Sequence, residues 1–321
     1  MGSCLAAPKK KSEKTDIQQK SEIALANESA DIIIPPIIQK WFPANNIVGD
    51  ISQVLKIKKR IGDGVTSQVY SVVYDAQLCA LKRVKKEYEQ SIYFFSLEVK
   101  LLSKLSHPNI IEYKNVYIDN QYLYMILELC NIDLYGIIYE RGYLYDEDRA
   151  RIVVEKLLNA LKYIHDQNIA HRDIKPENIV FTDETFLEPK LVDFGDALKV
   201  RKDMTYDDMV GTPQYLSPQR LTDHNYFDIL QSDIWSLGTI LYEMLSQRKC
   251  FDDNERKMIF VKILKNQWKW PDRIKGNISK SLADFVSKCI TINVHKRLTS
   301  TTALQHEWIS TNNSYTPQSE S

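Results

Sequence analysis

Residues 169–181 read IAHRDIKPENIVF, a stretch in which several chemically versatile side chains lie close together. It places His, Arg, two acids, Lys, Pro and Asn close together and closes them between apolar ends. The question that it raises is what chemistry needs Asp173 and Asn178 so near each other, with Lys175 between them. The answer depends on what the rest of the chain supplies.

The bulk composition is that of a globular protein without a strong charge bias. The chain has 321 residues, and because single hydrophobic cores stop growing near about 250 residues, two lobes around two cores are expected. Its 42 basic side chains equal its 42 acidic ones, which argues against general nucleic-acid binding. The five cysteines have no paired or metal-ligand spacing, so neither a disulfide framework nor a zinc site is expected. We therefore expect an intracellular, cytoplasmic protein.

The composition along the chain sets two terminal segments, residues 1–50 and 311–321, apart from a body of residues 51–310. Residues 1–50 are rich in Lys, Ser, Glu and Gln and then carry Pro35, Pro36 and Pro43, so they are expected to be a partly disordered tail and linker. Residues 311–321 are polar and are expected to be disordered. No run approaches the roughly 18 apolar residues of a transmembrane span, and no apolar signal peptide opens the chain.

The body, residues 51–310, divides near residue 130. Residues 51–130 hold five alternating or β-branched stretches and one helical stretch, whereas residues 131–310 are mainly helical, as in DEDRARIVVEKLLNALKYIHDQ. The five predicted strands are VLKIKKRIG, SQVYSVVYD, LCALKRV, YKNVYID and YLYMILEL. The expected fold class is therefore α+β, with a small antiparallel sheet and one main helix in the first lobe and a mainly α-helical second lobe.

The first lobe carries a candidate phosphate site. Gly62 and Gly64 would let the backbone approach a ligand closely and direct amide N–H groups at phosphate, although any hairpin turn could contain two glycines. Lys82, on the next strand but one, could aim its ammonium group at the same phosphates. Glu98 lies among apolar residues of the helical stretch, where a carboxylate would be costly unless paired, so Lys82 is its natural partner.

From Ile61 to Ile309 the chain resembles the eukaryotic protein kinases. The motifs occur in that family's order: the glycine loop, Lys82, Glu98, HRDIKPEN, DFG, GTPQYLSP and SDIWSLG. HRDIKPEN and GTPQY resemble the serine/threonine branch. KILKNQWKWP, SDIWSLG and ALQHEWI most resemble the calmodulin-dependent and calcium-dependent kinase group, yet no D-x-[DN]-x-[DN]-G calcium loop is present, so direct calcium binding is not expected.

The resemblance implies the roles of the catalytic residues. Asp173 would accept or orient the proton of the substrate hydroxyl, while Asn178 and Asp193 of DFG would bind Mg²⁺. Lys175 would neutralise charge on the γ-phosphoryl group of ATP during transfer. Thr212 of GTPQY could brace the catalytic loop by hydrogen-bonding near Asp173 and Lys175.

The resemblance also places the nucleotide site. ILELCNIDLY would be the hinge, with Leu127 as gatekeeper and with the backbones of Glu128 and Cys130 pairing the adenine edge. Asp133 would lie near the ribose, or else cap the following helix. The predicted ATP-binding residues are Ile61, Gly62, Gly64, Val69, Ala80, Lys82, Glu128, Cys130 and Asp133.

Two positions depart from the family pattern. Ser67 replaces the third glycine of the nucleotide loop, which restricts the backbone slightly. Gln219 replaces the glutamate that normally pairs with a buried arginine, here Arg297. A glutamine still accepts a hydrogen bond, so a somewhat weakened second lobe is expected rather than an inactive enzyme.

A third departure concerns regulation. Many kinases carry a phosphorylated threonine that pairs with the HRD arginine, here Arg172, and Asp208 stands at that position. An aspartate could supply part of the phosphate's charge, so basal activity without loop phosphorylation is expected. The alternatives are that Asp208 has no fixed partner, or that Thr205 or Tyr206 is a phosphosite.

Glu177 and Glu243 match positions that hold a basic residue upstream of the target site in basophilic relatives. Substrates with Arg before Ser or Thr are therefore expected to be preferred. The alternative is that these are two surface acids with no common task.

The opening MGSCLAAPKKK favours attachment to a membrane. Gly2 could be myristoylated and Cys4 palmitoylated, and the lysines that follow would add attraction to acidic lipid. The acylation pattern calls for Ser or Thr where Ala6 stands, and the alternative is an ordinary disordered start.

Together these observations predict a magnesium-dependent protein serine/threonine kinase that acts on protein substrates in signalling. The alternatives are an inactive pseudokinase that acts as a membrane-tethered scaffold, and a kinase of small molecules or lipids. The intact Lys82, Asp173 and Asp193 argue against the first, and GTPQYLSP, which resembles a peptide-docking segment, argues against the second.

Overall fold

The computed structural model describes residues 46, 48, 50–64, 67–87, 89–201, 211–222 and 226–310. All of them belong to one compact unit of the chain, residues 35–321. Most of the predicted N-terminal tail and the predicted C-terminal tail lie outside the described residues, as do Gly2, Cys4, Thr205 and Asp208. Among the residues described, no helix is long and apolar enough to cross a membrane.

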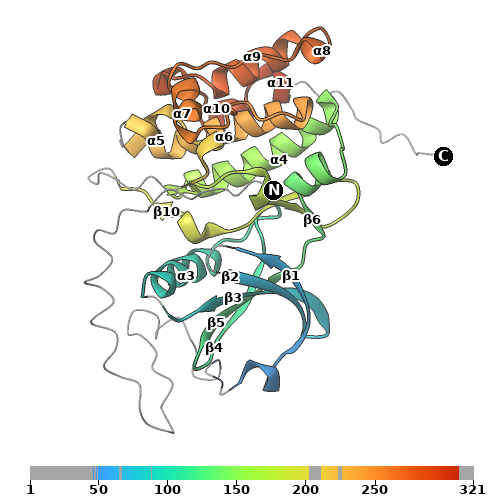
Figure 1. The fold of residues 1–321 in the computed structure, drawn as a ribbon, viewed down its shortest axis with the longest axis vertical. Coiled ribbons are helices and arrows are strands. Elements are labelled where there is room, and N and C mark those ends of the chain that lie inside the picture. Colours follow the sequence, from blue (N-terminus) through green and yellow to red (C-terminus); the bar gives the residue numbers. More distant parts are fainter. Residues whose placement is uncertain are drawn as a thin grey trace, which may run out of the picture. The chain divides into compact units, whose positions relative to one another are not determined.

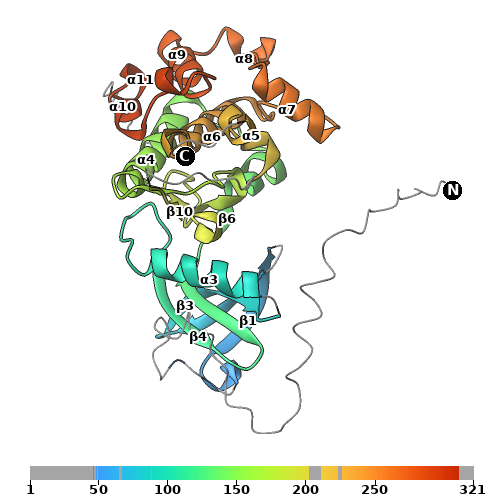
Figure 2. The same ribbon diagram turned by 90° about the vertical axis from the view of Figure 1, so that its left-hand side faces the viewer.

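The first lobe is a five-stranded antiparallel sheet with the strand order β1-β2-β3-β5-β4 (Figure 1). The strands are β1 (Lys56–Asp63), β2 (Ser67–Tyr74), β3 (Gln77–Lys85), β4 (Tyr113–Ile118) and β5 (Tyr122–Glu128). Helix α3 (Glu89–Leu102) packs against β3, β4 and β5 (Figure 2). The five predicted strands and the single helix are confirmed.

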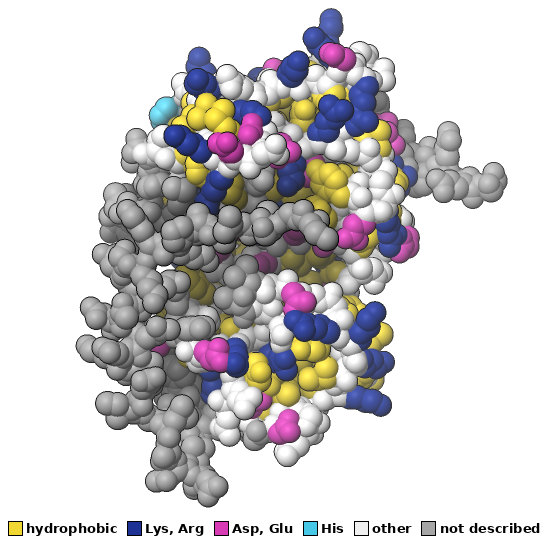
Figure 3. Space-filling view, viewed as in Figure 1, with side chains coloured by type: hydrophobic (Ala, Val, Ile, Leu, Met, Phe, Trp, Pro, Cys, Tyr) yellow, Lys and Arg dark blue, Asp and Glu magenta, His cyan; other side chains and the backbone are white. Residues whose placement is uncertain are grey.

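The segment that precedes β1 covers the other face of this sheet. Lys82 of β3 points toward Glu98 of α3, so Cys79 and Leu81 point the opposite way, as alternation along a strand requires. These two residues are buried in one apolar cluster with Ile51, from the single-turn helix η2 (Ile51–Gln53). All four Lys and Arg residues of the edge strand β1 are exposed, and basic side chains gather at the lower right of Figure 3, on the side where β1 lies.

The second lobe is mainly helical, which confirms the predicted α+β bilobal fold (Figure 1). Its helices are α4 (Glu147–His165), α5 (Pro218–Thr222), α6 (Tyr226–Ser246), α7 (Arg256–Leu264), α8 (Asp272–Lys275), α9 (Lys280–Cys289), α10 (Ser300–Leu304) and α11 (Glu307–Ser310). Its single turns are the π-helix η3 (Gly136–Glu140) and the 3₁₀ turns η4 (Pro176–Asn178), η5 (Phe194–Asp196), η6 (Pro213–Tyr215) and η7 (Val294–Lys296).

Helices α4 and α6 form the centre of this lobe. The Asp146 side chain accepts the Arg149 amide at 2.8 Å and so caps α4. The apolar residues at helical spacing along α4 are all buried: Ala150, Val153, Val154, Leu157, Leu158, Leu161 and Ile164. Helix α6 lies close against α9: a Cβ at Gly238 would stand 2.5 Å from the Cβ of Cys289. Only glycine permits so close an approach of the two helices.

Short strands hold the HRDIKPEN loop between these helices and the sheet of the first lobe. They are β6 (Ile132–Asp133), β7 (Ile169–Ala170), β8 (Ile179–Phe181), β9 (Pro189–Leu191) and β10 (Leu198–Lys199). Strand β7 pairs with β10, and β8 lies between β6 and β9. Residues 171–178 therefore begin and end at paired strands, which fixes both ends of the loop.

Gln219 does accept a hydrogen bond from the buried Arg297, at 2.7 Å, as the sequence predicted. Its amide nitrogen also donates to the Ile292 carbonyl at 2.5 Å, a contact that a glutamate could not make. The guanidinium group of Arg297 is bonded further to the carbonyls of Thr291 and Gln231, and it lies 5.0 Å from the centre of the Trp235 ring. The amide side chain of Gln219 thus fits this position on both sides.

We expect replacement of Gln219 with alanine to lower the free energy of unfolding by about 1–2 kcal/mol. The change removes two hydrogen bonds and leaves one donor of a buried guanidinium group with fewer partners. Urea denaturation of purified protein measures the effect. Gln305→Ala is the matched control, because Gln305 is exposed and its side chain forms no hydrogen bond with the described residues. Equal stability of the two variants would contradict the expectation.

Candidate active site

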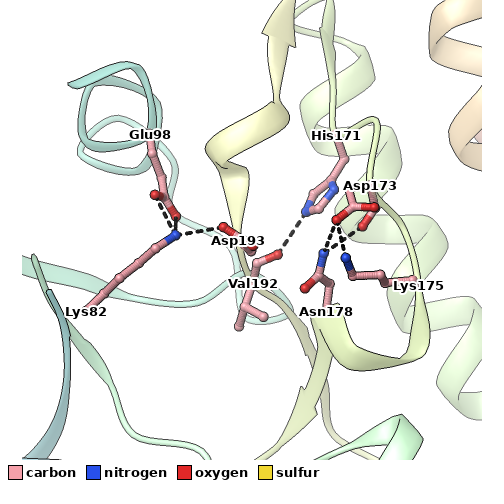
Figure 4. A network of polar contacts seen from close by, with 8 residues as sticks. All are labelled: Lys82, Glu98, His171, Asp173, Lys175, Asn178, Val192 and Asp193. Atoms are coloured by element: carbon pink, nitrogen blue, oxygen red, sulfur yellow. Dashed lines mark hydrogen bonds and ion pairs between the residues drawn. The ribbon is translucent and has the colours of Figure 1, made fainter. Parts of the chain in front are cut away.

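An ammonium group shared by two carboxylates connects the two lobes (Figure 4). Lys82, on β3, donates to both carboxylate oxygens of Glu98, on α3, at 2.8 Å, which confirms the predicted pair. The same nitrogen lies 2.7 Å from Oδ1 of Asp193, which precedes η5. One cation thus fixes the sheet, the helix and the DFG segment relative to one another.

The charges of this group depend on one another. Burial opposes the charged form of Lys82, but the carboxylates of Glu98 and Asp193 together raise its pKa. Burial raises the pKa of Glu98, and Lys82 opposes that rise. The Lys82 ammonium group lowers the pKa of Asp193 to about 2. Because this value lies below the ordinary 3.8, ionised Asp193 stabilises the fold above about pH 4, and that stability is lost as the pH falls toward 2.

The HRDIKPEN loop brings the second group of predicted residues together (Figure 4). Nζ of Lys175 lies 2.6 Å from Oδ2 of Asp173, and the amide nitrogen of Asn178 donates to the same oxygen at 3.0 Å. The Thr212 hydroxyl lies 3.3 Å from both Lys175 Nζ and Asp173 Oδ1, as the predicted brace requires. The oxygen of Asn178 points away from Asp173, so it can still accept a hydrogen bond or bind a cation.

Two residues of the site have strained backbones. Arg172 and Asp193 have φ values of 70° and 62°, in the left-handed region that non-glycine residues seldom adopt. Asp233, on α6, holds the first of them: its carboxylate accepts the amides of His171 and Arg172, each at 2.9 Å. It also lies 2.9 Å from His165 Nε2. One buried carboxylate on α6 therefore fixes the conformation of the loop backbone at residues 171 and 172.

Other packing contacts support the two loops. Phe194, fully buried, meets the His171 ring edge-on at 4.7 Å between centroids, and His171 Nε2 lies 3.0 Å from the Val192 carbonyl oxygen. Gly211 has a φ of +110°, and a Cβ there would stand 3.0 Å from the Arg172 carbonyl oxygen. The glycine before Thr212 is thus needed for the close approach that brings the threonine to Asp173.

A cleft of about 1010 Å³ opens beside these residues, between the sheet and the second lobe. All nine residues predicted to bind the nucleotide line it: Ile61, Gly62, Gly64, Val69, Ala80, Lys82, Glu128, Cys130 and Asp133. Leu127, the predicted gatekeeper, also lines it, and so do Asn178 and Asp193 at its inner end. The predicted nucleotide and metal residues therefore face one cavity.

The hinge residues have further contacts of their own. The Glu128 amide donates to the Glu112 carbonyl at 2.9 Å, and its carboxylate lies 3.0 Å from Lys190 Nζ. Burial raises the pKa of the Cys130 thiol to about 12, so it stays protonated. Oδ1 of Asp133 accepts the Gly136 amide at 2.7 Å, which supports the capping role for this residue.

Glu243 is buried, so the alternative that Glu177 and Glu243 are two surface acids with no common task is wrong for Glu243. It is fully buried, and its carboxylate accepts the hydroxyl groups of Tyr139 at 2.5 Å and Tyr215 at 2.9 Å. Burial raises its pKa, and the two tyrosines oppose that rise. Glu177, by contrast, is exposed and lines the cleft.

The predicted contact between Arg172 and Asp208 cannot be placed, because Asp208 lies outside the described residues. The guanidinium group of Arg172 donates through Nε to the Asp196 carbonyl at 2.6 Å. Arg172 therefore contacts the segment just after DFG.

Sequence reasoning did not assign the role of Asp233. The residue stands in SDIWSLG, a motif whose other members, apart from two serines, are apolar or glycine, and it is 1% exposed. A single acid within an apolar helix is costly unless it is paired, and that signal could have indicated a structural anchor.

We expect Asp233→Asn to lower the free energy of unfolding by about 1–3 kcal/mol. An asparagine places an NH₂ group where an oxygen now accepts an N–H, which leaves a buried donor unpaired. Thermal or urea denaturation measures the change. Asp166→Asn is the control: among the residues that the structure describes, the Asp166 side chain pairs only with Lys162, in an exposed ion pair worth about 0.5 kcal/mol or less. A loss no larger than that of the control would show that Asp233 does not anchor the loop.

Comparison with known proteins agrees with this geometry. Residues 55–309 match the family model of the protein kinase domain. The chain is 32% identical over 274 residues to myosin light chain kinase A of Dictyostelium discoideum, covering 83% of this chain and 91% of the relative. It is 33% identical over 267 residues to calcium/calmodulin-dependent protein kinase type 1B of Rattus norvegicus, covering 81% and 76%.

A third relative is longer than this chain. The chain is 31% identical over 277 residues to calcium-dependent protein kinase 5 of Plasmodium falciparum, and the alignment covers 85% of this chain but only 48% of that protein. These relatives confirm the predicted resemblance to the calmodulin-dependent and calcium-dependent kinase group. The chain belongs to the protein kinase family.

Proposed function

We propose that this chain is a magnesium-dependent serine/threonine kinase, which transfers the γ-phosphate of ATP to Ser or Thr hydroxyls of protein substrates. The observation that carries the proposal is the convergence of Lys82, Lys175, Asn178 and Asp193 at the inner end of one cleft. Asp173 lies 2.6 Å from Lys175 and lines the adjoining cavity, which Lys82 and Asp193 also line. Phosphoryl transfer needs alignment and charge compensation more than covalent help from the protein. These residue types supply both.

The donor set at the cleft suits Mg²⁺ and ATP. Magnesium prefers oxygen ligands and is commonly held by one or two carboxylates together with substrate phosphates. Asp193, ionised and partly exposed, and the free oxygen of Asn178 are the ligands that this chain would provide. The metal would supply neutralisation of charge between the phosphates. Gly64 and Ser67 lie close together: the Gly64 amide donates to the Ser67 carbonyl at 2.8 Å, and a Cβ at Gly64 would stand 2.6 Å from the Ser67 hydroxyl.

Each of the chain's own groups then has a task. Asp173 would orient the substrate hydroxyl and accept its proton, since its carboxylate is held by Lys175, Asn178 and Thr212. Lys175, whose ammonium group is stabilised by Asp173, would balance charge on the transferred group. Thr212 links the loop to the segment after Gly211, and this threonine favours a serine/threonine kinase.

Substrates with Arg before the target Ser or Thr remain the proposed preference. Glu177, exposed beside Lys175, supplies the carboxylate that would receive the guanidinium group. Glu243 is occupied by Tyr139 and Tyr215, so we assign it a supporting role only.

Acylation of Gly2 and Cys4, attachment to a membrane and a role in signalling are proposals that rest on the sequence alone. Labelling with a myristate analogue tests the first of them, with Gly2→Ala as the control. A label that remains on Gly2→Ala would contradict it.

We expect phosphatase-treated protein to transfer phosphate from labelled ATP to an Arg-containing Ser/Thr peptide in Mg²⁺ with calcium chelated. Asp193→Ala should abolish transfer, and Asp173→Asn should lower kcat by about 10²- to 10⁴-fold, because the proton acceptor is lost. Chelation of Mg²⁺ should stop the reaction. Transfer equal in wild type and Asp193→Ala would contradict the proposal, and no transfer with any Ser/Thr peptide would favour the pseudokinase scaffold.

We expect Asp208→Ala to lower kcat of the phosphatase-treated protein by about five-fold, the equivalent of about 1 kcal/mol, if this acid replaces a loop phosphate opposite Arg172. Asp207→Ala, its neighbour in sequence, is the matched control and should have little effect. An unchanged rate in Asp208→Ala would overturn the regulatory proposal without affecting the proposed reaction.

A further inference from the structure

A second cavity, of about 750 Å³, lies in the helical lobe. It is lined by Tyr242 of α6, by residues 248–250 and 252 of the loop that follows α6, by Lys262 of α7, and by residues 267–273, which run into α8. None of its lining residues lines the nucleotide cleft. The cavity is of the size that ligand sites commonly have. Nothing in the proposed phosphoryl transfer uses it.

Three aromatic rings form one wall of this cavity. Tyr242 stacks on Trp270, with 5.0 Å between ring centroids, and Trp268 meets both rings edge-on at 6.1 Å and 5.9 Å. The Tyr242 hydroxyl donates to the Lys269 carbonyl at 3.1 Å, which fixes the Trp-Lys-Trp segment against α6. Tyr242 is buried, whereas both tryptophans are only half-buried. A rigid apolar surface is therefore held at the edge of solvent.

Cations that are not used in ion pairs surround these rings. Lys262 lies 2.9 Å from Asp253 and is neutralised by it. The other lining cations, Arg248, Lys249, Lys269 and Arg273, form no ion pair within the described part of the chain. Arg248 and Arg273 line the same cavity as the three rings, so their charges lie beside the aromatic wall.

The balance of charge in this cavity differs from that of the chain. Against the four cations stand two lining carboxylates, Asp252 and Asp272, although the whole chain has no net charge. A surface that combines an excess of cations with exposed aromatic rings matches a ligand with carboxylates on both sides of an apolar side chain. Surface cations that only increase solubility have no need to lie in a cavity beside exposed aromatic rings, so this arrangement favours a binding site.

We propose that this cavity is a docking site for an acidic segment of a partner protein, which lays an aromatic or large apolar side chain against Trp268 and Trp270. Carboxylates on either side of that side chain would lie near Arg248, Lys249 and Lys269. The segment would bind outside the nucleotide cleft, so docking is independent of phosphoryl transfer and could bring a partner to the same lobe as the catalytic loop.

The test uses the full chain and a fluorescein-labelled peptide that carries one Phe among Asp and Glu residues, followed by fluorescence anisotropy at low and moderate salt. We expect it to bind, and a peptide with Asn and Gln in place of the acids to bind at least about ten-fold more weakly. The double variant Arg248→Ala/Lys269→Ala should lose about five-fold in affinity or more. Both residues are exposed, so the fold should be retained.

Matched controls separate docking from general attraction of charge. Lys257→Ala/Lys280→Ala removes two exposed cations that do not line the cavity and should bind like wild type. Trp268→Ala, checked by thermal denaturation, should weaken binding although no charge changes. Asp193→Ala should bind the peptide normally, which separates this site from the transfer site.

Three results would overturn the proposal. They are equal affinity for the acidic and the amide peptide, equal loss in the control pair and in Arg248→Ala/Lys269→Ala, and displacement of the peptide by single-stranded DNA as readily as by unlabelled acidic peptide. The last would show a site for polyanions of any kind rather than for an acidic protein segment.

Discussion

The charge of Lys82 is the constraint on which the active arrangement depends. Its ammonium group lies within 2.8 Å of carboxylates from α3 and from the DFG segment, so three parts of the chain meet at one atom. The Lys82 side chain is 14% exposed and that of Glu98 is 3% exposed, so either charge would be costly without a partner. Each group therefore favours the ionised form of the others. The position of α3 against the sheet and the position of Asp193 at the cleft consequently depend on each other through Lys82.

A second buried charge does the same for the helical lobe. The carboxylate of Asp233 accepts two consecutive backbone amides, and it thereby holds Arg172 at a φ that its side chain disfavours. The strain positions Asp173 for contact with Lys175, Asn178 and Thr212. Buried or partly buried charges on β3, α3 and α6 thus hold the DFG segment and the HRDIKPEN loop in place. Both loops are therefore supported by side chains on regular strands and helices.

Most of the fold could be predicted from patterns of a few residues. Alternation along the first lobe indicated its five strands, and helical spacing of apolar residues indicated α4, because both patterns reflect which face of a local element is buried. The pairing of Lys82 with Glu98 was also predictable, since an acid among apolar residues requires a partner. The roles of Asp233 and Glu243 were not, because their partners come from segments far apart in sequence.

The sequence alone determined which chemical groups this protein has and in what order: two lysines, two aspartates and an asparagine in the kinase motifs, and a glutamine where a glutamate is usual. The periodicity of apolar residues predicted the strands and helices because it reflects which face of a single strand or helix is buried. Only the tertiary structure decided that Gln219 bonds Ile292 in addition to Arg297, and that two tyrosines donate to the buried Glu243. It also decided that Tyr242 and two tryptophans form one wall of a cavity lined by cations. These contacts depend on distances between elements, which sequence spacing does not specify.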